Sequence, residues 1–241
     1  MTLGDYTRNV GYKTGAITYE FETKTFNYDC GIRLFADVMD VEEAGVNDCF
    51  VEAGAELMRT QVAPEADAFT FAQIASHTGV TVNTEDLSEA EAVDVLKALR
   101  EITSAMDEKR VTLGSRYLFI SPTLKGVLDD YSYANPTMSN RVLERFARVV
   151  EVPQVRFYTA IDLKSGDTEF GYAKAATGKA INFMVVEKSA VIKFDKHVAS
   201  RVFSPDELEA LDSYMMKYRK YGIVELFDNK LDGVYVSAAT E

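Results

Sequence analysis

Residues Val46 to Ser76 read VNDCFVEAGAELMRTQVAPEADAFTFAQIAS, and their hydrophobic spacing is helical over the whole stretch. Apolar side chains such as Phe50 and Leu57 gather on one side of this helix, and charged side chains such as Glu52 gather on another. Pro64 removes a backbone hydrogen bond and clashes with the preceding turn, so we expect a kink or a break there. The pattern predicts one long helix, or alternatively two helices of about equal length.

Upstream of this helix, two segments alternate apolar and polar residues, as is typical of a strand with one solvated face. The first segment is Ile17 to Glu22, and the second runs from Ile32 to Val38 after a turn at Asp29 to Gly31. Together they predict an extended β arm. A two-stranded ribbon is only marginally stable in water, so its apolar face, which carries Tyr19 and Phe21, needs a neighbouring subunit to lie against.

Downstream, the chain alternates helical and strand patterns and predicts an α+β domain. Ser88 and Glu91 have the spacing of a capping box that opens a second helix. The apolar residues of that helix recur every three or four positions and predict a buried stripe of Ala92, Val95, Leu96, Leu99, Ile102 and Met106. A strand is expected over Arg116 to Ser121, followed by a helix with Pro122 as its first residue.

Two more strands are expected in the last third of the chain, over Ala180 to Lys188 and Ala190 to Phe194, because both segments are rich in Ile, Val and Phe. Met215 to Phe227 and Gly233 to Val236 flank a turn-rich connection. This arrangement predicts a hairpin at the end of the chain. The first part of Met215 to Phe227 also fits helical spacing.

The composition argues against several classes of function. Lys and Arg number 26 against 38 Asp and Glu, so the net charge of −12 repels nucleic-acid phosphates at long range. No stretch is apolar enough to span a bilayer, and Met1 to Gly15 lacks the features of a signal peptide. Cys30 and Cys49 are too few for a disulfide framework or for a zinc site made of Cys alone. We expect a soluble chain with reduced thiols.

Catalytic motifs are absent from the sequence. Neither Gly-x-Ser-x-Gly nor His-Glu-x-x-His occurs, and we expect His77 and His197 to be hydrogen-bonded structural residues. Ala176 to Ala180 matches a phosphate-binding loop only in part, and Asp228 to Gly233 matches a Ca²⁺ loop only in part. We therefore predict a chain that is not an enzyme, with no catalytic residue, cofactor or metal.

Several short phrases are more informative when they are read together. They are Asp5 to Asn9 followed by Gly11-Tyr12, Val62 to Ala68, Lys196 to Ala199, Phe203 to Asp206, and Tyr221-Gly222 through Asp228 to Lys230 up to Gly233 to Val236. In order and spacing they resemble the tailed-bacteriophage major capsid proteins, and the likeness runs over essentially the whole chain.

This resemblance implies the phage Hong Kong 97 type capsid fold. That α+β fold has an extended β-hairpin loop, a peripheral domain with a long spine helix and a β-sheet, and an axial domain. Residues 1–31 are then expected to form the extended loop and 32–79 the first part of the peripheral domain with the spine helix. Residues 80–191 are expected to form the axial domain, and 192–241 the second part of the peripheral domain.

The resemblance also implies a structural function. Copies of the chain are expected to form hexamers and pentamers that tile the icosahedral head of a tailed double-stranded DNA bacteriophage. Expected partners are the chain itself, the packaged DNA without sequence specificity, and scaffold, portal or decoration proteins, with no membrane. The expected location is the virion capsid, assembled in the cytoplasm of the host bacterium. The alternative is an encapsulin, a nanocompartment shell that packages a cargo enzyme.

In such a shell the projecting arm is expected to contact the adjacent subunit. Nothing around Lys13 or Lys24 favours covalent cross-linking, so we expect non-covalent assembly. The candidate contact residues are the charged and aromatic side chains of the arm, namely Arg8, Tyr12, Lys13, Tyr19, Glu20, Phe21, Glu22 and Lys24.

Overall fold

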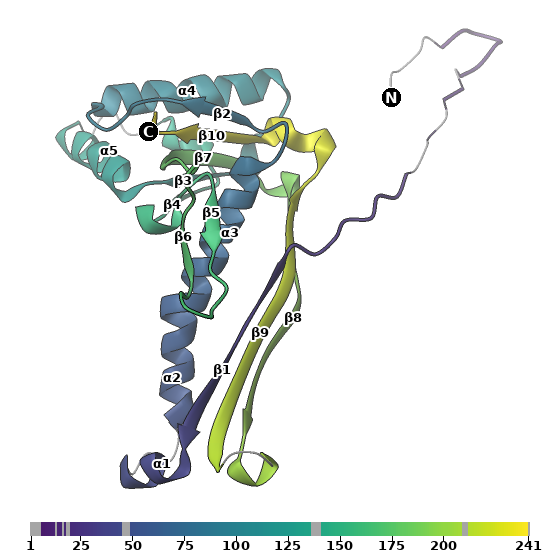
Figure 1. Ribbon diagram of the computed structural model, residues 1–241. Helices are drawn as coiled ribbons and strands as arrows, with labels where there is room; N and C mark the ends of the chain where they lie inside the picture. Colours follow the sequence, from purple (N-terminus) through teal and green to yellow (C-terminus); the bar gives the residue numbers. More distant parts are fainter. Residues whose placement is uncertain are drawn as a thin grey trace.

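The protein consists of an elongated stalk, a layered domain on top of it, and an arm that projects to one side (Figure 1). The computed structural model describes residues 6–12, 14–15, 17, 20–44, 49–135, 141–208 and 212–240. The stalk is a long helix beside a three-stranded sheet, and the layered domain is built on a five-stranded sheet. The arm is residues 6–27, of which 13, 16, 18 and 19 lie outside the described residues.

The long helix of the stalk is continuous from Cys49 to Ser76. It consists of α2 (Cys49–Leu57), a π-helical turn (Met58–Val62) and α3 (Ala63–Ser76). Pro64 lies in the first turn of α3, directly after the wider π-helical turn. A π-helical turn is a usual way to accommodate an interruption of the α-helical hydrogen bonds. The predicted long helix is confirmed over the described residues, with its irregularity at the expected place.

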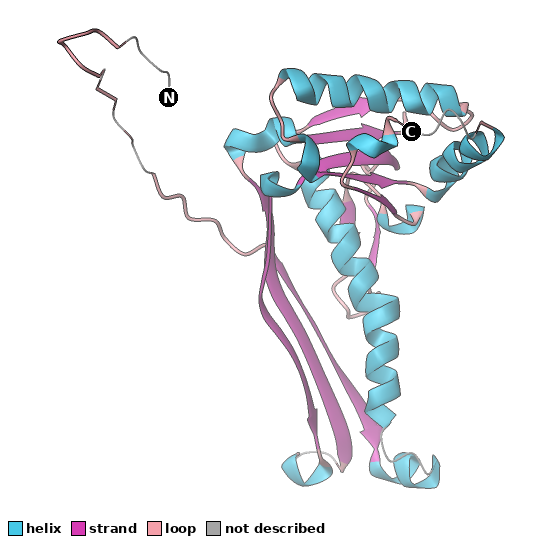
Figure 2. Ribbon diagram, turned by 180° about the vertical axis from the view of Figure 1, so that it is seen from behind, coloured by secondary structure: helices cyan, strands magenta, loops and turns pink. Residues whose placement is uncertain are grey.

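The three-stranded sheet of the stalk is antiparallel and has the order β1 (Tyr28–Asp37), β9 (Ser213–Leu226), β8 (Val191–Phe203). Along β1 buried or half-buried side chains alternate with exposed ones, because only one face of the sheet is turned toward the long helix. Figure 2 shows the sheet and the helix running side by side along the stalk. A short helix, α1 (Val38–Ala44), follows β1 at the far end of the stalk.

The five-stranded sheet of the layered domain takes strands from distant parts of the chain. Its order is β2-β10-β7-β3-β4, in which β7 is antiparallel to both of its neighbours. The strand bounds are β2 Thr81–Thr84, β3 Arg116–Ile120, β4 Arg148–Glu151, β7 Ile181–Glu187 and β10 Val234–Ala238. Two further strands, β5 (Ile161–Leu163) and β6 (Tyr172–Lys174), form a small separate hairpin.

Hydrophobic side chains fill both faces of the five-stranded sheet. On one face α4 (Ala92–Glu108) and α5 (Pro122–Ala134) pack against Phe183 of β7, and on the other face α3 packs near Met184 of the same strand. All six residues of the predicted stripe on α4 belong to the hydrophobic cluster between the sheet and the α4 and α5 helices. The stripe and the start of α5 at Pro122 are therefore confirmed.

Two pairings that the sequence predicts are wrong. Ile17 to Glu22 is not a strand where it is described, and β1 pairs with β9, from the other end of the chain. The expected terminal hairpin does not form either, because β9 lies in the stalk sheet whereas β10 pairs with β7 and β2. The segment expected to form the extended loop is therefore an arm without regular strand pairing among its described residues.

The start of α4 also differs from the prediction. Ser88 hydrogen-bonds to Asp86 instead of capping a helix, with Oγ 2.7 Å from Oδ1. The helix begins at Ala92, and its capping box is formed by Glu91 and Asp94, whose Oδ2 accepts the Glu91 amide at 3.3 Å. The capping pattern therefore occurs three residues later than predicted.

Candidate subunit-interface surfaces

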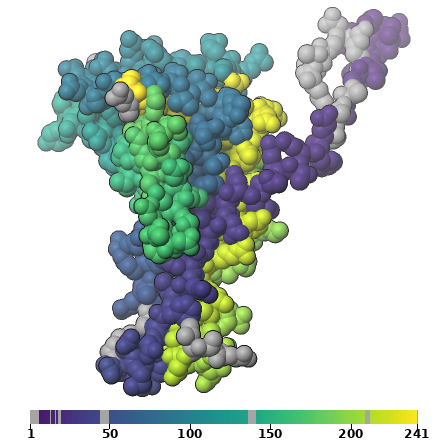
Figure 3. Space-filling view, in the orientation of Figure 1, coloured from purple at the N-terminus to yellow at the C-terminus, as the bar shows by residue number. Residues whose placement is uncertain are grey.

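The tip of the arm is a tight turn that stands clear of the rest of the subunit (Figure 3). Thr7 and Gly11 form an isolated bridge, and the amide of Gly11 donates to the carbonyl of Thr7 at 3.0 Å. Asn9 and Gly11 have positive φ angles of 74° and 92°, which Asn and Gly adopt most readily. The rings of Tyr6 and Tyr12 lie 5.1 Å apart across this turn. The positive φ angles of Asn9 and Gly11 and the bridge between Thr7 and Gly11 shape a tight turn that brings two aromatic rings together at the tip.

Two large aromatic side chains in the described part of the arm lie in solvent. Phe21 is 99% exposed and Tyr12 is 91% exposed. Large apolar side chains are rarely left fully in water unless a partner covers them. These exposed rings give the arm an apolar surface that is suited to contact with a neighbouring molecule.

Of the predicted contact residues, Lys13 and Tyr19 lie outside the described residues. The other six belong to the described part of the arm, and all except the half-buried Lys24 are exposed. Lys24 lies 2.7 Å from Glu22, and the hydrogen bond with that carboxylate raises the pKa of Lys24. The structure thus places Arg8 and Tyr12 at the tip of the arm and Glu20, Phe21, Glu22 and Lys24 nearer its root.

The root of the arm is fixed firmly to the stalk. The Asn27 side chain makes two hydrogen bonds to the backbone of Val224, donating at 2.8 Å and accepting at 3.0 Å. Lys24 lies 3.8 Å from a carboxylate oxygen of Asp228, and Tyr28, the first residue of β1, is buried. The arm is therefore anchored at its base.

The two histidines have different environments. His77, which follows α3, places Nε2 2.9 Å from Oε1 of Glu225 and 4.0 Å from Asp228, beside the root of the arm. This agrees with the structural role predicted for His77. His197 is exposed on β8 opposite Tyr221, and within the described part of the chain no hydrogen bond to its ring is found. The prediction of a hydrogen-bonded ring is therefore wrong for His197.

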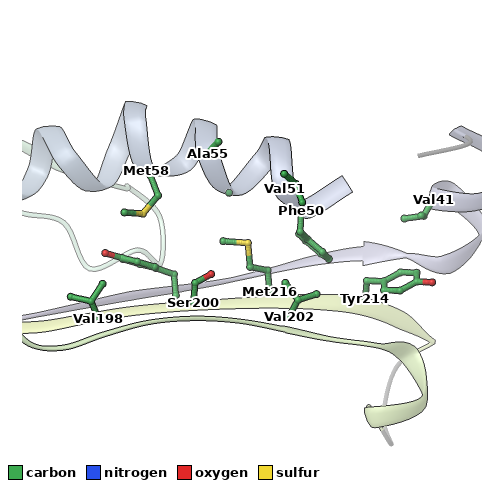
Figure 4. A pocket seen from close by; sticks show the side chains of 12 residues that line it. Val41, Phe50, Val51, Ala55, Met58, Val198, Ser200, Val202, Tyr214 and Met216 are labelled. Atoms are coloured by element: carbon green, nitrogen blue, oxygen red, sulfur yellow. The ribbon is translucent and has the colours of Figure 1, made fainter. Parts of the chain in front are cut away.

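An apolar groove separates α2 from the stalk sheet (Figure 4). Its volume is about 690 Å³, and Phe50 and Met58 enter it from the helix while Val202 and Met216 enter it from the sheet. At Gly54 the helix leaves little room above the sheet, since an added Cβ would lie 3.2 Å from the terminal carbon of Met216. The groove was not predicted because part of its sheet side, Val198 to Val202, lies in β8 beyond the predicted strand, and because the pairing of β8 with β9 opposite α2 has no local signal.

The buried charged groups are used within the fold. Arg116 is fully buried, and it donates to the carbonyls of Thr103 and Val111 at 3.3 and 2.6 Å and lies 2.8 Å from Asp107. Among the described residues, no three or more His, Cys, Asp and Glu side chains are grouped so that they could hold a metal ion. No described helix is long and apolar enough to cross a membrane.

Comparison of the structure with solved structures identifies the fold, although no family of known sequences and no curated protein matches the chain. A chain of the mature capsid of bacteriophage PhiM1 superposes with a TM-score of 0.61 at 16% identity, over 98% of this chain and 80% of that one. The chain has a phage capsid fold. The capsid fold is also shared with Mycobacterium phage Che8, at a TM-score of 0.60 and 14% identity over 98% of this chain and 80% of that one.

The same capsid fold occurs in a virus-like particle from Pyrococcus furiosus. The TM-score is 0.59 at 10% identity, over 90% of this chain and 78% of that one. The fold predicted from the sequence, an α+β capsid fold of the Hong Kong 97 type, is thus confirmed.

Proposed function

We propose that the chain is a major capsid protein, whose copies assemble into the icosahedral head of a tailed double-stranded DNA bacteriophage. The observation that supports this most is the arm, which projects from a subunit with a capsid fold and leaves Phe21 almost fully exposed. In a shell, the same arm of every subunit would bury its apolar side chains on the next subunit. The proposed role is structural and non-enzymatic.

The stability of such a shell would come from the same weak contact being made by every subunit. Burying one large apolar side chain contributes about 1.5–3 kcal/mol, which is too little alone to hold two subunits together. In a closed ring every subunit both gives and receives an arm, so the contacts close without free ends. Weak contacts at Tyr12 and Phe21 would therefore add up to a stable hexamer or pentamer.

The division into axial and peripheral domains becomes part of this proposal. The stalk, with the long helix and β1, β8 and β9, would form the peripheral domain. The five-stranded sheet would lie toward the axis of the hexamer or pentamer. This assignment moves β10 (Val234–Ala238) from the predicted peripheral segment into the axial domain, since it pairs with β7.

Partners other than the chain itself follow from the same proposal. The head would enclose double-stranded DNA without sequence specificity, and a net charge of −12 would keep most of the subunit surface from binding its phosphates. Scaffold, portal or decoration proteins would join the assembly in the cytoplasm of the host bacterium. The mature location would be the virion capsid.

Negative-stain electron microscopy of the purified full chain tests the proposal. Closed shells or capsomer rings are the expected result, and a variant lacking Arg8 to Thr25 should fold but not assemble. The control is the far-ultraviolet circular dichroism of the deletion variant, which should match that of the full chain. If the full chain stayed monomeric at every concentration tested, the proposed function would be wrong.

The second candidate is an encapsulin shell, which the likeness to the Pyrococcus furiosus virus-like particle favours. The two candidates differ in what the shell contains. Particles made in cells that carry the neighbouring genes should hold nuclease-protected DNA if the chain is a phage capsid protein. They should instead hold a co-purifying enzyme if it is an encapsulin.

A further inference from the structure

The face of the stalk sheet that points away from α2 is basic and aromatic. Side chains alternate along each strand, so the residues that line the apolar groove, such as Met216 and Val202, lie on the opposite face. The charged and aromatic residues of the face turned away from α2 are Asp29, Arg33, Phe35, Asp37, His197, Arg201, Phe203, Lys217, Arg219 and Tyr221, in which cations outnumber carboxylates. We call this surface the basic face.

One row of the basic face holds three cations side by side. Lys217 on β9 pairs in register with Arg33 on β1 and with Arg201 on β8, and all three side chains are exposed. None of the three forms an ion pair with any described residue. Like charges directly opposite one another destabilise a sheet. An anion from outside would offset this repulsion.

Aromatic rings hold the cationic groups of this row in place. The guanidinium of Arg33 lies 5.7 Å from the ring centre of Phe35, and that of Arg201 lies 4.9 Å from Phe203. The Lys217 ammonium lies 4.7 Å from the same Phe203 ring. Cations held over rings in this way present a flat surface that combines positive charge with apolar contact. The partner should therefore present carboxylates to this row.

We propose that Arg33, Lys217 and Arg201 receive Glu20 and Glu22 from the arm of a second copy of this chain. The inference rests on the proposed function and names the surface that the arm occupies. In an extended segment, side chains two residues apart point the same way and lie about 6.5–7 Å apart. Three neighbouring strands span about 10 Å, so both carboxylates fit along the row.

The arm offers the matching chemistry. Glu20 and Glu22 are exposed and flank Phe21. In an extended segment both carboxylates point the same way, and Phe21 points to the opposite side, where it stays available for another contact. Glu22 is held by Lys24 in the free subunit, at 2.7 Å. Lys24 also lies near Asp228, so it keeps a carboxylate partner when Glu22 turns to the row. The cost of releasing Glu22 is therefore small.

The subunit's own arm does not cover its basic face. Figures 1 and 2 show the arm leaving β1 at Tyr28 and running away from the sheet. The cationic row at Arg33 lies farther along β1, toward α1. Glu20 and Glu22 of the same subunit therefore lie away from the row, which leaves it open to the arm of another copy.

The test is a charge exchange in the full chain. The double variant R201E/K217E should raise the protein concentration needed for assembly by about tenfold or more, because two attractive pairs become repulsive. The double variant E20K/E22K should do the same, and the combination of all four substitutions should restore assembly. The matched control is K97E/R100E, which makes the same charge change at exposed positions on α4 and should assemble as the natural chain does.

Light scattering and electron microscopy give the assembled fraction, and circular dichroism checks that each variant folds. If the reversed variant R201E/K217E unfolds, the neutral variant R201Q/K217Q takes its place and should weaken assembly less strongly. Normal assembly of the R201E/K217E variant would overturn this inference while leaving the proposed function intact, and so would a loss that E20K/E22K does not rescue. Intact shells that lose only their protected DNA would show that phosphates occupy the row, which also overturns it. Absence of shells from the natural chain would instead contradict the proposed function.

Discussion

The hydroxyl of Tyr28 donates a hydrogen bond of 2.9 Å to Oε1 of Glu65, and this bond joins the start of β1 to the first turn of α3. The Tyr28 ring also packs on Phe69, with ring centres 4.9 Å apart. Burial is the main reason why the pKa of Tyr28 is raised, and the nearby Glu65 carboxylate raises it further. The direction in which the arm leaves the stalk is thus set by a contact with the long helix.

Replacing Tyr28 with Phe should therefore destabilise the subunit modestly. The ring contact with Phe69 stays, but the hydrogen bond is lost, which costs about 1 kcal/mol in the free energy of unfolding. Urea unfolding followed by circular dichroism measures this. Tyr133→Phe is the control, since Tyr133 on α5 is 91% exposed. Equal midpoints for the two variants would show that the bond to Glu65 contributes nothing.

Leu99 tests the packing of α4 against the five-stranded sheet. Its side chain is fully buried in the cluster that includes Phe183, so Leu99→Ala should cost about 2–5 kcal/mol in the free energy of unfolding. Val93→Ala, on the exposed side of the same helix, should cost less than about 0.5 kcal/mol. An unchanged melting midpoint for Leu99→Ala would contradict this packing.

Asp107 should make stability depend on pH in acid. Burial alone would raise its pKa, but hydrogen bonds from Arg116 and Arg145 outweigh burial and hold the pKa below the ordinary value. Because the folded pKa is lower, the ionised carboxylate stabilises the fold above the ordinary carboxyl pKa of about 3.9. This contribution is lost as the pH falls through the folded pKa.

Chemical unfolding measured between about pH 6 and pH 2 checks the Asp107 prediction. Asp107→Asn should lower the free energy of unfolding at neutral pH, because it leaves the buried Arg116 without its carboxylate. It should also flatten the decline in acid. Asp167→Asn, at an exposed position, is the control and should follow the natural chain. If Asp107→Asn kept the full decline, other carboxylates would be responsible for it.

Cys30 should react slowly while the protein is folded. Burial is the main reason why the pKa of its thiol rises to about 12, and Glu65 adds to the effect. At pH 8 this leaves roughly a thousandfold less thiolate than an ordinary cysteine of pKa about 8.5. Iodoacetamide labelling followed by peptide mass spectrometry should show slow modification of Cys30 in buffer and fast modification in urea. Equal rates of Cys30 modification in buffer and in urea would mean that the thiol is exposed to solvent in the folded protein.

The parts of the fold that local spacing determines could be predicted, whereas strand partners could not. The stripe on α4 and the long helix follow from a period within one segment, and both are found. β1 was predicted as a strand, but its partner β9 lies far along the chain and gives no local signal. The cationic row is likewise assembled from three distant positions, Arg33, Arg201 and Lys217, and no sequence window shows them together.

The arm shows why an alternating pattern can mislead. The alternation of apolar and polar residues in Ile17 to Glu22 indicates an extended segment with one apolar side and one polar side. A β-strand also needs a neighbouring strand to pair with. Within one subunit no partner reaches the described part of this segment. If the arm binds a second copy, the pattern records a contact that only the assembly completes.

The most direct measurement is a cryo-electron microscopy reconstruction of the assembled shell at a resolution that shows side chains. We predict density for Glu20 to Glu22 of each arm on the neighbouring subunit, with the two carboxylates against Arg33, Lys217 and Arg201. An arm folded back on its own stalk, or a cationic row left open to solvent, would contradict this account.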